Sequence, residues 1–171
     1  MQALYETEVT SDQIDHLGHM NVRFYGVHAR AGAERLLASI GLEAGDTSTV
    51  VHRDSYVRHH QEQLVGAPLV VRGAFLSATS ERIRVYEELS NADTGALAAT
   101  FVLSFELADR RDRARLDLPP AVVGAALADL EALPEHGLPR SISVDEDPGA
   151  TAPSLEVLHD LDLAVLSLIH I

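Results

Sequence analysis

The stretch Gly18-His-Met-Asn21 leads directly into Val22-Arg-Phe-Tyr-Gly-Val-His-Ala-Arg-Ala-Gly-Ala-Glu-Arg-Leu-Leu-Ala-Ser-Ile40, and the two segments together decide the fold class. Apolar residues in the second segment recur at close to helical spacing. Asn21 is of the type that caps a helix N-terminus, and Gly41 is of the type that follows a helix C-terminus. We therefore predict one long helix over residues 22–40.

The predicted helix carries unusually small side chains on part of its surface. Gly26, Ala29, Gly32 and Ala33 all fall within it. A glycine inside a helix costs up to about 1 kcal/mol relative to alanine. This cost is explained if a sheet packs closely around the helix, and we expect such packing here.

The rest of the core predicts β-strands, because apolar and polar residues alternate. In the segment Ser48–Arg58, four alternate residues are expected to share one face: Val50, His52, Asp54 and Tyr56. In the segment Leu97–Leu107, Phe101 and Phe105 belong to an apolar stripe that we assign to the core. One long helix among antiparallel strands predicts the α+β class. The predicted strands are Met1–Thr10, Ser48–Arg58, Leu69–Leu76, Ile83–Leu89 and Leu97–Leu107.

Composition limits the partners and the compartment. The 171 residues carry 13 basic and 26 acidic side chains, a net charge of −13, which argues against nucleic-acid binding. No apolar run of about 18 residues is present, so no contact with a membrane is expected. The chain has no cysteine and no signal-peptide pattern, which predicts a cytoplasmic protein. We expect neither a metal nor a separate cofactor.

The domain organisation changes after the last predicted strand. We expect a main domain over residues 1–118, a short helix over residues 119–133, and a linker and tail over residues 134–171. The linker is rich in proline, glycine and acidic residues. The sequence ends abruptly on Leu-Ser-Leu-Ile-His-Ile. We expect this tail to be the start of a truncated second module.

The segment just before the helix carries the residues suited to chemistry. The first backbone N–H groups of a helix lack internal partners and form the positive end of its dipole, so they can stabilise a carbonyl oxygen that becomes negative. A carboxylate beside them, here Asp15, would supply a base for water or a nucleophile. A thiol leaving group needs little protonation, since its pKa is about 8.5. The pattern predicts acyl-transfer hydrolysis, although Asp15 could also simply cap its own turn.

The pattern Asp-x-x-Gly-His-Met-Asn-x-x-x-Tyr at residues 15–25, before a long helix and four strands, resembles the hotdog-fold thioesterases. This group includes 4-hydroxybenzoyl-CoA thioesterase and the plant acyl-carrier-protein thioesterases. The resemblance covers about Leu4 to Leu118 and implies a helix wrapped by an antiparallel sheet. Val22 stands where many relatives have a second Asn, and Leu17 stands where the plant branch has one. Residues 56–107 have a looser resemblance to betainyl-CoA thioesterase modules.

The resemblance implies roles for individual residues. Asp15 matches the base or nucleophile, and the backbone amides around Asn21 and Val22 would hold the oxyanion. His19 and Glu62 match the histidine and the acidic partner of the plant branch. The acyl pocket is expected to include Phe24, Tyr25 and His28. Three arginines near strand ends are weaker candidates for the CoA phosphates, or they are simply solvated: Arg72, Arg82 and Arg84.

The activity that the resemblance implies is hydrolysis of an acyl-CoA thioester to free acid and CoA. Hotdog sites usually form between subunits and a single sheet leaves an edge to cover, so we expect a homodimer or a tetramer of dimers. Two alternatives stay open. One is a non-catalytic acyl-CoA or lipid-binding module, or the inactive half of a double-hotdog protein. The other is a hotdog hydratase or dehydratase acting on an enoyl thioester.

Overall fold

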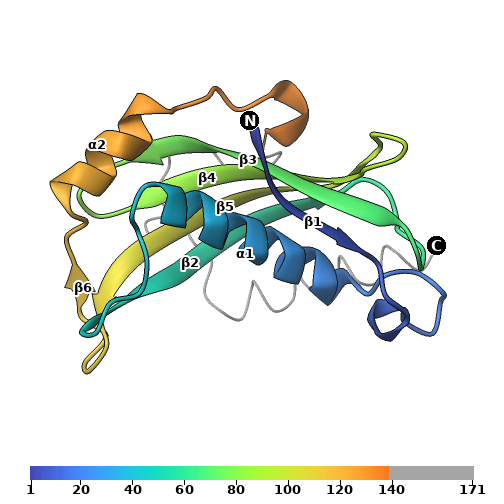
Figure 1. Cartoon of the computed structure of the whole chain (residues 1–171), viewed down its shortest axis with the longest axis horizontal. Coiled ribbons are helices and arrows are strands. Elements are labelled where there is room, and N and C mark those ends of the chain that lie inside the picture. Colours follow the sequence, from blue (N-terminus) through green and yellow to red (C-terminus); the bar gives the residue numbers. More distant parts are fainter. Residues whose placement is uncertain (139–171) are drawn as a thin grey trace. The chain divides into compact units, whose positions relative to one another are not determined.

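The computed structural model describes residues 1–138, in which one long helix lies across an antiparallel sheet (Figure 1). The helix, α1, spans Val22–Ser39. The strand order is β1-β3-β4-β5-β2, with the two-residue β6 paired to β5. This architecture confirms the predicted α+β class. The strands are β1 (Gln2–Glu8), β2 (Ser48–His59), β3 (Pro68–Ala78), β4 (Ile83–Asn91), β5 (Leu97–Asp109) and β6 (Arg115–Leu116).

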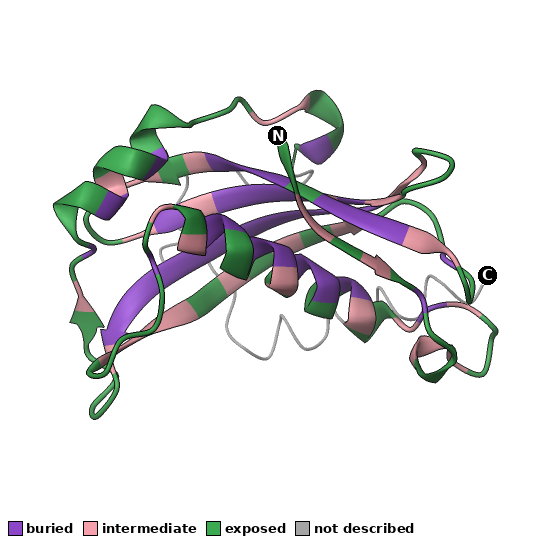
Figure 2. Cartoon of the chain, viewed as in Figure 1, coloured by how far each residue is buried: buried purple, intermediate pink, exposed green. Residues whose placement is uncertain are grey.

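The core lies between α1 and the sheet, and Figure 2 shows buried residues along the side of α1 that faces the strands. Ala29, Ala33 and Leu36 recur at helical spacing and are buried. They pack into one cluster with alternate residues of the central strands, among them Val71 and Val85. The outward side of α1 is exposed and mixed in character, since Val22 and Val27 lie there among charged residues. No helix within residues 1–138 is long and apolar enough to cross a bilayer.

The two glycines of α1 behave differently. A Cβ atom at Gly32 would lie 2.6 Å from Val71 Cγ1 and 2.9 Å from Glu87 Oε1, so the sheet does approach the helix closely there. A Cβ atom at Gly26 would meet no atom of residues 1–138 within 4 Å. The expectation of close packing is therefore confirmed at Gly32 and wrong at Gly26.

Strand β2 contains a β-bulge that inverts its alternation. His52 pairs with Phe105, whereas Asp54 pairs with the next residue, Ser104, so Arg53 is the extra residue. The His52 ring stacks on Phe105, with centroids 5.2 Å apart, on the face that α1 covers. Asp54 accepts a hydrogen bond from Ser104 Oγ, at 2.8 Å, on the opposite face. The expectation that Val50, His52, Asp54 and Tyr56 share one face is wrong, because an inserted residue moves later side chains to the other face.

The chain after β5 returns to the sheet. Helix α2 spans Pro120–Ala128 and so ends before the predicted limit at residue 133. Gly137 is buried, and a Cβ atom there would lie 2.5 Å from a ring carbon of Tyr86. The Arg58 guanidinium donates to the carbonyls of His136 and Leu138, at 2.7 and 3.2 Å. Residues 134–138 thus pack on the main domain, and the rest of the predicted linker and tail lies outside the described residues.

One ionisable group is buried inside the apolar core. Glu87 is 0% exposed, and neither carboxyl oxygen has a hydrogen-bond partner among residues 1–138. Its side chain lies between Gly32 of α1 and Gly73 of β3, where a Cβ atom would crowd it. Burial raises the pKa of Glu87 well above its usual value near 4.5. The carboxyl is therefore held as the neutral acid over a wider pH range than an exposed one.

Alanine substitutions at Gly26 and Gly32 separate the effect of helix propensity from the effect of packing between α1 and the sheet. Gly26→Ala should raise the free energy of unfolding by about 0.5–1 kcal/mol, since alanine favours the helix and the space is open. Gly32→Ala should lower it by about 1–3 kcal/mol, because the methyl group overpacks against Val71. Urea unfolding of both variants measures the difference. A Gly32→Ala variant as stable as the parent would contradict the close approach of helix and sheet.

Glu87 should make stability depend on pH. The folded state keeps the proton that the unfolded chain releases above about pH 4.5, so this contribution to stability is full below that pH. It is lost as the pH rises toward the folded-state pKa. The melting temperature of the parent should therefore fall relative to that of Glu87→Gln as the pH rises above about 4.5. Glu43→Gln, at an exposed position, is the control. A pH-independent difference between the parent and Glu87→Gln would contradict the neutral buried carboxyl.

Candidate active site

The segment that links β1 to α1 is a closed loop. Ile14 and Met20 form an antiparallel bridge, and the Asp15 N–H donates to the His19 carbonyl at 3.0 Å. Gly18 donates to the Asp15 carbonyl at 3.1 Å and has φ of +87°, a left-handed conformation that favours glycine. The spacing Asp-x-x-Gly-His therefore forms a tight turn. Its geometry holds the backbones of Asp15 and His19 side by side.

The Asp15 carboxylate has one engaged oxygen. Its Oδ1 accepts a hydrogen bond from the Leu17 N–H at 2.9 Å, so Asp15 does cap its own turn. Within residues 1–138, Oδ2 has no hydrogen-bond partner. The side chain is half-buried. The turn thus restricts the carboxylate through one oxygen and leaves the other for a ligand or water.

The start of α1 is capped as the sequence predicts. Asn21 Oδ1 accepts from the Arg23 N–H at 3.1 Å, and the Asn21 carbonyl accepts from the Phe24 N–H at 2.9 Å. The Asn21 N–H itself donates to the Gln13 carbonyl at 2.9 Å. The Val22 N–H has no acceptor among the described residues, and Val22 is 43% exposed. Two backbone N–H groups are expected around the oxyanion. That of Asn21 already donates to Gln13, whereas that of Val22 donates to no acceptor within residues 1–138.

The structure brings together two candidates that lie far apart in sequence. His19 Nε2 is 3.2 Å from Glu62 Oε2. The two side chains are 36% and 60% exposed, respectively. Glu62 follows the end of β2, in a loop that runs beside the Asp15–His19 turn. Asp15, His19, Glu62 and the start of α1 therefore belong to one region at the end of the sheet.

Backbone and side-chain hydrogen bonds attach the Glu62 loop to this region. The Met20 N–H donates to the Gln63 carbonyl at 2.8 Å, and the Tyr25 hydroxyl donates to the Gln61 carbonyl at 3.3 Å. Gln63 is buried, at 3% exposed. No periodicity or spacing in the sequence distinguishes Gln63 from its neighbours. Its importance becomes visible only in the folded structure.

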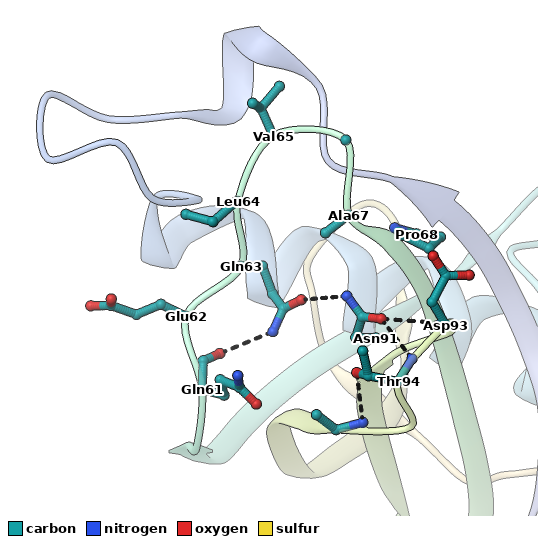
Figure 3. Close-up of a pocket in the computed structure, with 12 residues that line it drawn as sticks. Gln61, Glu62, Gln63, Leu64, Val65, Ala67, Pro68, Asn91, Asp93 and Thr94 are labelled. Atoms are coloured by element: carbon teal, nitrogen blue, oxygen red, sulfur yellow. Dashed lines mark hydrogen bonds between the residues drawn. The ribbon is translucent and has the colours of Figure 1, made fainter.

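A cavity of about 380 Å³ lies beside this loop (Figure 3). Residues 61–68 form one wall, and the turn between β4 and β5 forms the other. Among residues 1–138, Glu62 and Asp93 are its only charged lining residues, and none of the described arginines lines it. The lining from the turn comprises Asn91, Asp93, Thr94 and Ala96. No three histidine, cysteine or acidic side chains of the described residues gather closely enough to hold a metal ion.

The three expected acyl-pocket residues lie on α1 but do not line this cavity. Phe24 is half-buried beneath the Arg23 guanidinium, 4.5 Å from the ring centroid. Tyr25 and His28 are buried, and the His28 ring stacks on Tyr5. Burial raises the pKa of Tyr25 and lowers that of His28, so both side chains are favoured in their neutral forms. Their role toward a substrate stays a prediction.

The three candidate arginines lie away from the Asp15 region. Val71 and Gly73 face α1, so Arg72 between them points to the opposite face. Arg82 binds Glu106 at 2.7 Å, and Arg84 pairs in register with Ser104. Both lie at the start of β4, whereas the cavity lies at its end. The structure does not bring these arginines to the Asp15–His19–Glu62 region.

Solved structures share this fold. A 1,4-dihydroxy-2-naphthoyl-CoA thioesterase from Synechocystis is 19% identical with a TM-score of 0.64, covering 74% of this chain and 95% of that one. A Staphylococcus aureus protein determined in complex with CoA is 20% identical with a TM-score of 0.70, covering 83% and 96%. At these identities the likeness shows the fold, and it confirms the hotdog architecture that the sequence resemblance implies.

Sequence similarity assigns the family. The L-carnitine dehydrogenase/betainyl-CoA thioesterase of Agrobacterium fabrum is 30% identical over 141 residues, 80% of this chain. The chain spans only 28% of the length of that protein. The sequence profile of the thioesterase-like superfamily matches residues 9–127, which include the whole Asp15–His19–Glu62 region. The chain belongs to the thioesterase-like superfamily.

Proposed function

We propose that this chain hydrolyses an acyl-CoA thioester to a free acid and CoA. One observation carries the proposal. A single turn holds Asp15 and the His19–Glu62 pair at the start of α1, where the Val22 N–H has no acceptor among residues 1–138. Family membership and the thioesterase names of its relatives support the same reaction.

The proposed chemistry places the thioester carbonyl oxygen on the Val22 N–H. The positive end of the α1 dipole favours the negative charge that develops on that oxygen. In one route Asp15 Oδ2 takes a proton from water as the water oxygen bonds to the carbonyl carbon; the C–S bond then breaks, and CoA leaves as a thiolate that takes up that proton. In the other route Oδ2 bonds to the carbonyl carbon and the C–S bond breaks, which leaves a mixed anhydride on Asp15 and a CoA thiolate. Water then hydrolyses the anhydride to the free acid and the Asp15 carboxylate, and the proton released goes to the thiolate.

The His19–Glu62 pair has a supporting role in this proposal. Its contact at 3.2 Å restricts the imidazole ring beside the Asp15 turn. A restricted ring donates or accepts one directed hydrogen bond, to the water or to the acyl group. Productive orientation is worth large factors in rate, because it removes the entropy of searching for the reactive geometry.

The proposal extends to the substrate and the assembly. The name of the Agrobacterium relative makes betainyl-CoA the first acyl-CoA to test, and the Synechocystis protein adds aromatic acyl-CoA compounds. Strand β2 pairs with β5 on one side only, so its other edge has unpaired backbone groups within residues 1–138. We expect a second copy to cover such an edge, giving a homodimer.

Asp15 variants test the activity. Asp15→Asn keeps an oxygen for the Leu17 N–H and so preserves the turn, but it cannot act as base or nucleophile. Turnover should fall by about 10² to 10⁴-fold in Asp15→Asn and in Asp15→Ala, while the melting temperature of Asp15→Asn stays close to that of the parent. A thiol reagent that detects CoA release from a panel of acyl-CoA compounds measures turnover.

Other outcomes point to the alternatives. Near-normal turnover of Asp15→Asn would remove Asp15 from the mechanism. Saturable binding of acyl-CoA without CoA release would favour a binding module. Conversion of an enoyl-CoA without CoA release would favour a hydratase.

A further inference from the structure

A chain of side-chain hydrogen bonds crosses the cavity wall from the β4–β5 turn to the Glu62 loop (Figure 3). Asn91 Oδ1 accepts from the backbone N–H groups of Asp93 and Thr94, at 3.1 and 3.0 Å. Asn91 Nδ2 donates to Gln63 Oε1 at 3.3 Å. Gln63 Nε2 in turn donates to the Gln61 carbonyl at 3.3 Å. Gln63 thus connects the turn to its own loop.

Each amide in this chain has only one orientation that satisfies its partners. The Gln61 carbonyl can only accept, so the Gln63 amide must present its nitrogen to it. At the other end, two backbone N–H groups require the oxygen of Asn91. Asn91 therefore presents its nitrogen to the Gln63 oxygen. A chain directed at both ends by backbone groups specifies one arrangement and resists a flip of either amide.

Gln63 also anchors the loop through its backbone. Its carbonyl accepts from the Met20 N–H at 2.8 Å, in the segment that enters α1. The Gln61 carbonyl accepts from the Tyr25 hydroxyl as well. The residues on either side of Glu62 are therefore both held, although Glu62 itself is 60% exposed.

The His19–Glu62 contact is too weak to hold the loop. Ion pairs between exposed side chains contribute about 0–1 kcal/mol, because water screens the charges and both side chains lose rotamer freedom. Gln63, by contrast, is 3% exposed, and breaking its hydrogen bonds would leave buried polar groups unpaired. The buried hydrogen bonds of Gln63 therefore hold the loop, and the exposed His19–Glu62 contact depends on the loop position that they set.

We infer that Gln63 is a positioning residue that holds Glu62 against His19. The inference rests on the proposed function only in assigning the His19–Glu62 pair a role in turnover. Gln63 contacts no reacting atom in this scheme and acts through its neighbour. The proposed hydrolysis itself assigns no role to Gln63, so this positioning role is additional to it.

A double-mutant cycle tests the inference. Gln63→Met keeps the length of the side chain without its hydrogen bonds. It should lower kcat by about tenfold, with KM within about twofold of the parent, because misplacing a positioned group costs rate rather than binding. In a Glu62→Gln background, Gln63→Met should cause no further loss. An equal loss in both backgrounds would assign Gln63 a general structural role and overturn the inference. Asp93→Asn, on the opposite wall of the cavity, is the control and should stay within about twofold of the parent.

A second variant and a readout independent of activity complete the test. Asn91→Asp keeps the oxygen that caps the turn but removes the donor to Gln63, so it should lower kcat in the same direction even if Gln63→Met folds poorly. In either variant the Met20 amide, which donates to Gln63, should exchange hydrogen faster than in the parent, while amides of β5 are unchanged. Unchanged exchange at Met20 would overturn the inference. A parent protein that releases no CoA would refute the proposed function. The hydrogen exchange of the Met20 amide would in that case still test whether Gln63 holds the Glu62 loop in place.

Discussion

The close approach of α1 to the sheet at Gly32 is the constraint on which the rest of the structure depends. With no side chain at this position, Val71 of β3 and Glu87 of β4 reach the helix backbone. The helix can then lie across the central strands, and its buried residues join the sheet in one core. This contact sets where the N-terminus of α1 lies, at the end of the sheet beside the β2–β3 loop. The candidate site is a consequence of that placement.

The same packing leaves a polar group in the core. Glu87 occupies space that glycines on two elements make available, and nothing among residues 1–138 pairs with it. A buried carboxyl without partners destabilises the fold when it ionises. The core is therefore not uniformly optimised for stability. The described residues contain no compensating cation beside Glu87.

At the sheet end, stability and proposed chemistry use the same contacts. Asp15 and Asn21 both satisfy backbone N–H groups, one in the turn and one at the helix cap. The Val22 N–H and one Asp15 oxygen are left without partners among the described residues. The turn thus orients these groups while leaving them available. Gln63 performs a related task for the opposite loop, since it is satisfied on both sides and fixes the backbone around Glu62.

The sequence by itself determined the long helix, its cap at Asn21, the order of helix and strands along the chain and the turn that Asp15 caps. These features depend on local patterns, such as capping residues, alternation and a glycine in a tight turn, which neighbouring residues specify. Only the tertiary structure decided the order of the strands within the sheet, the bulge at Arg53, the open space at Gly26, the contact of His19 with Glu62 and the burial of Gln63. Those features depend on strand register and on contacts between distant segments, and a local pattern is the same whichever segment packs against it.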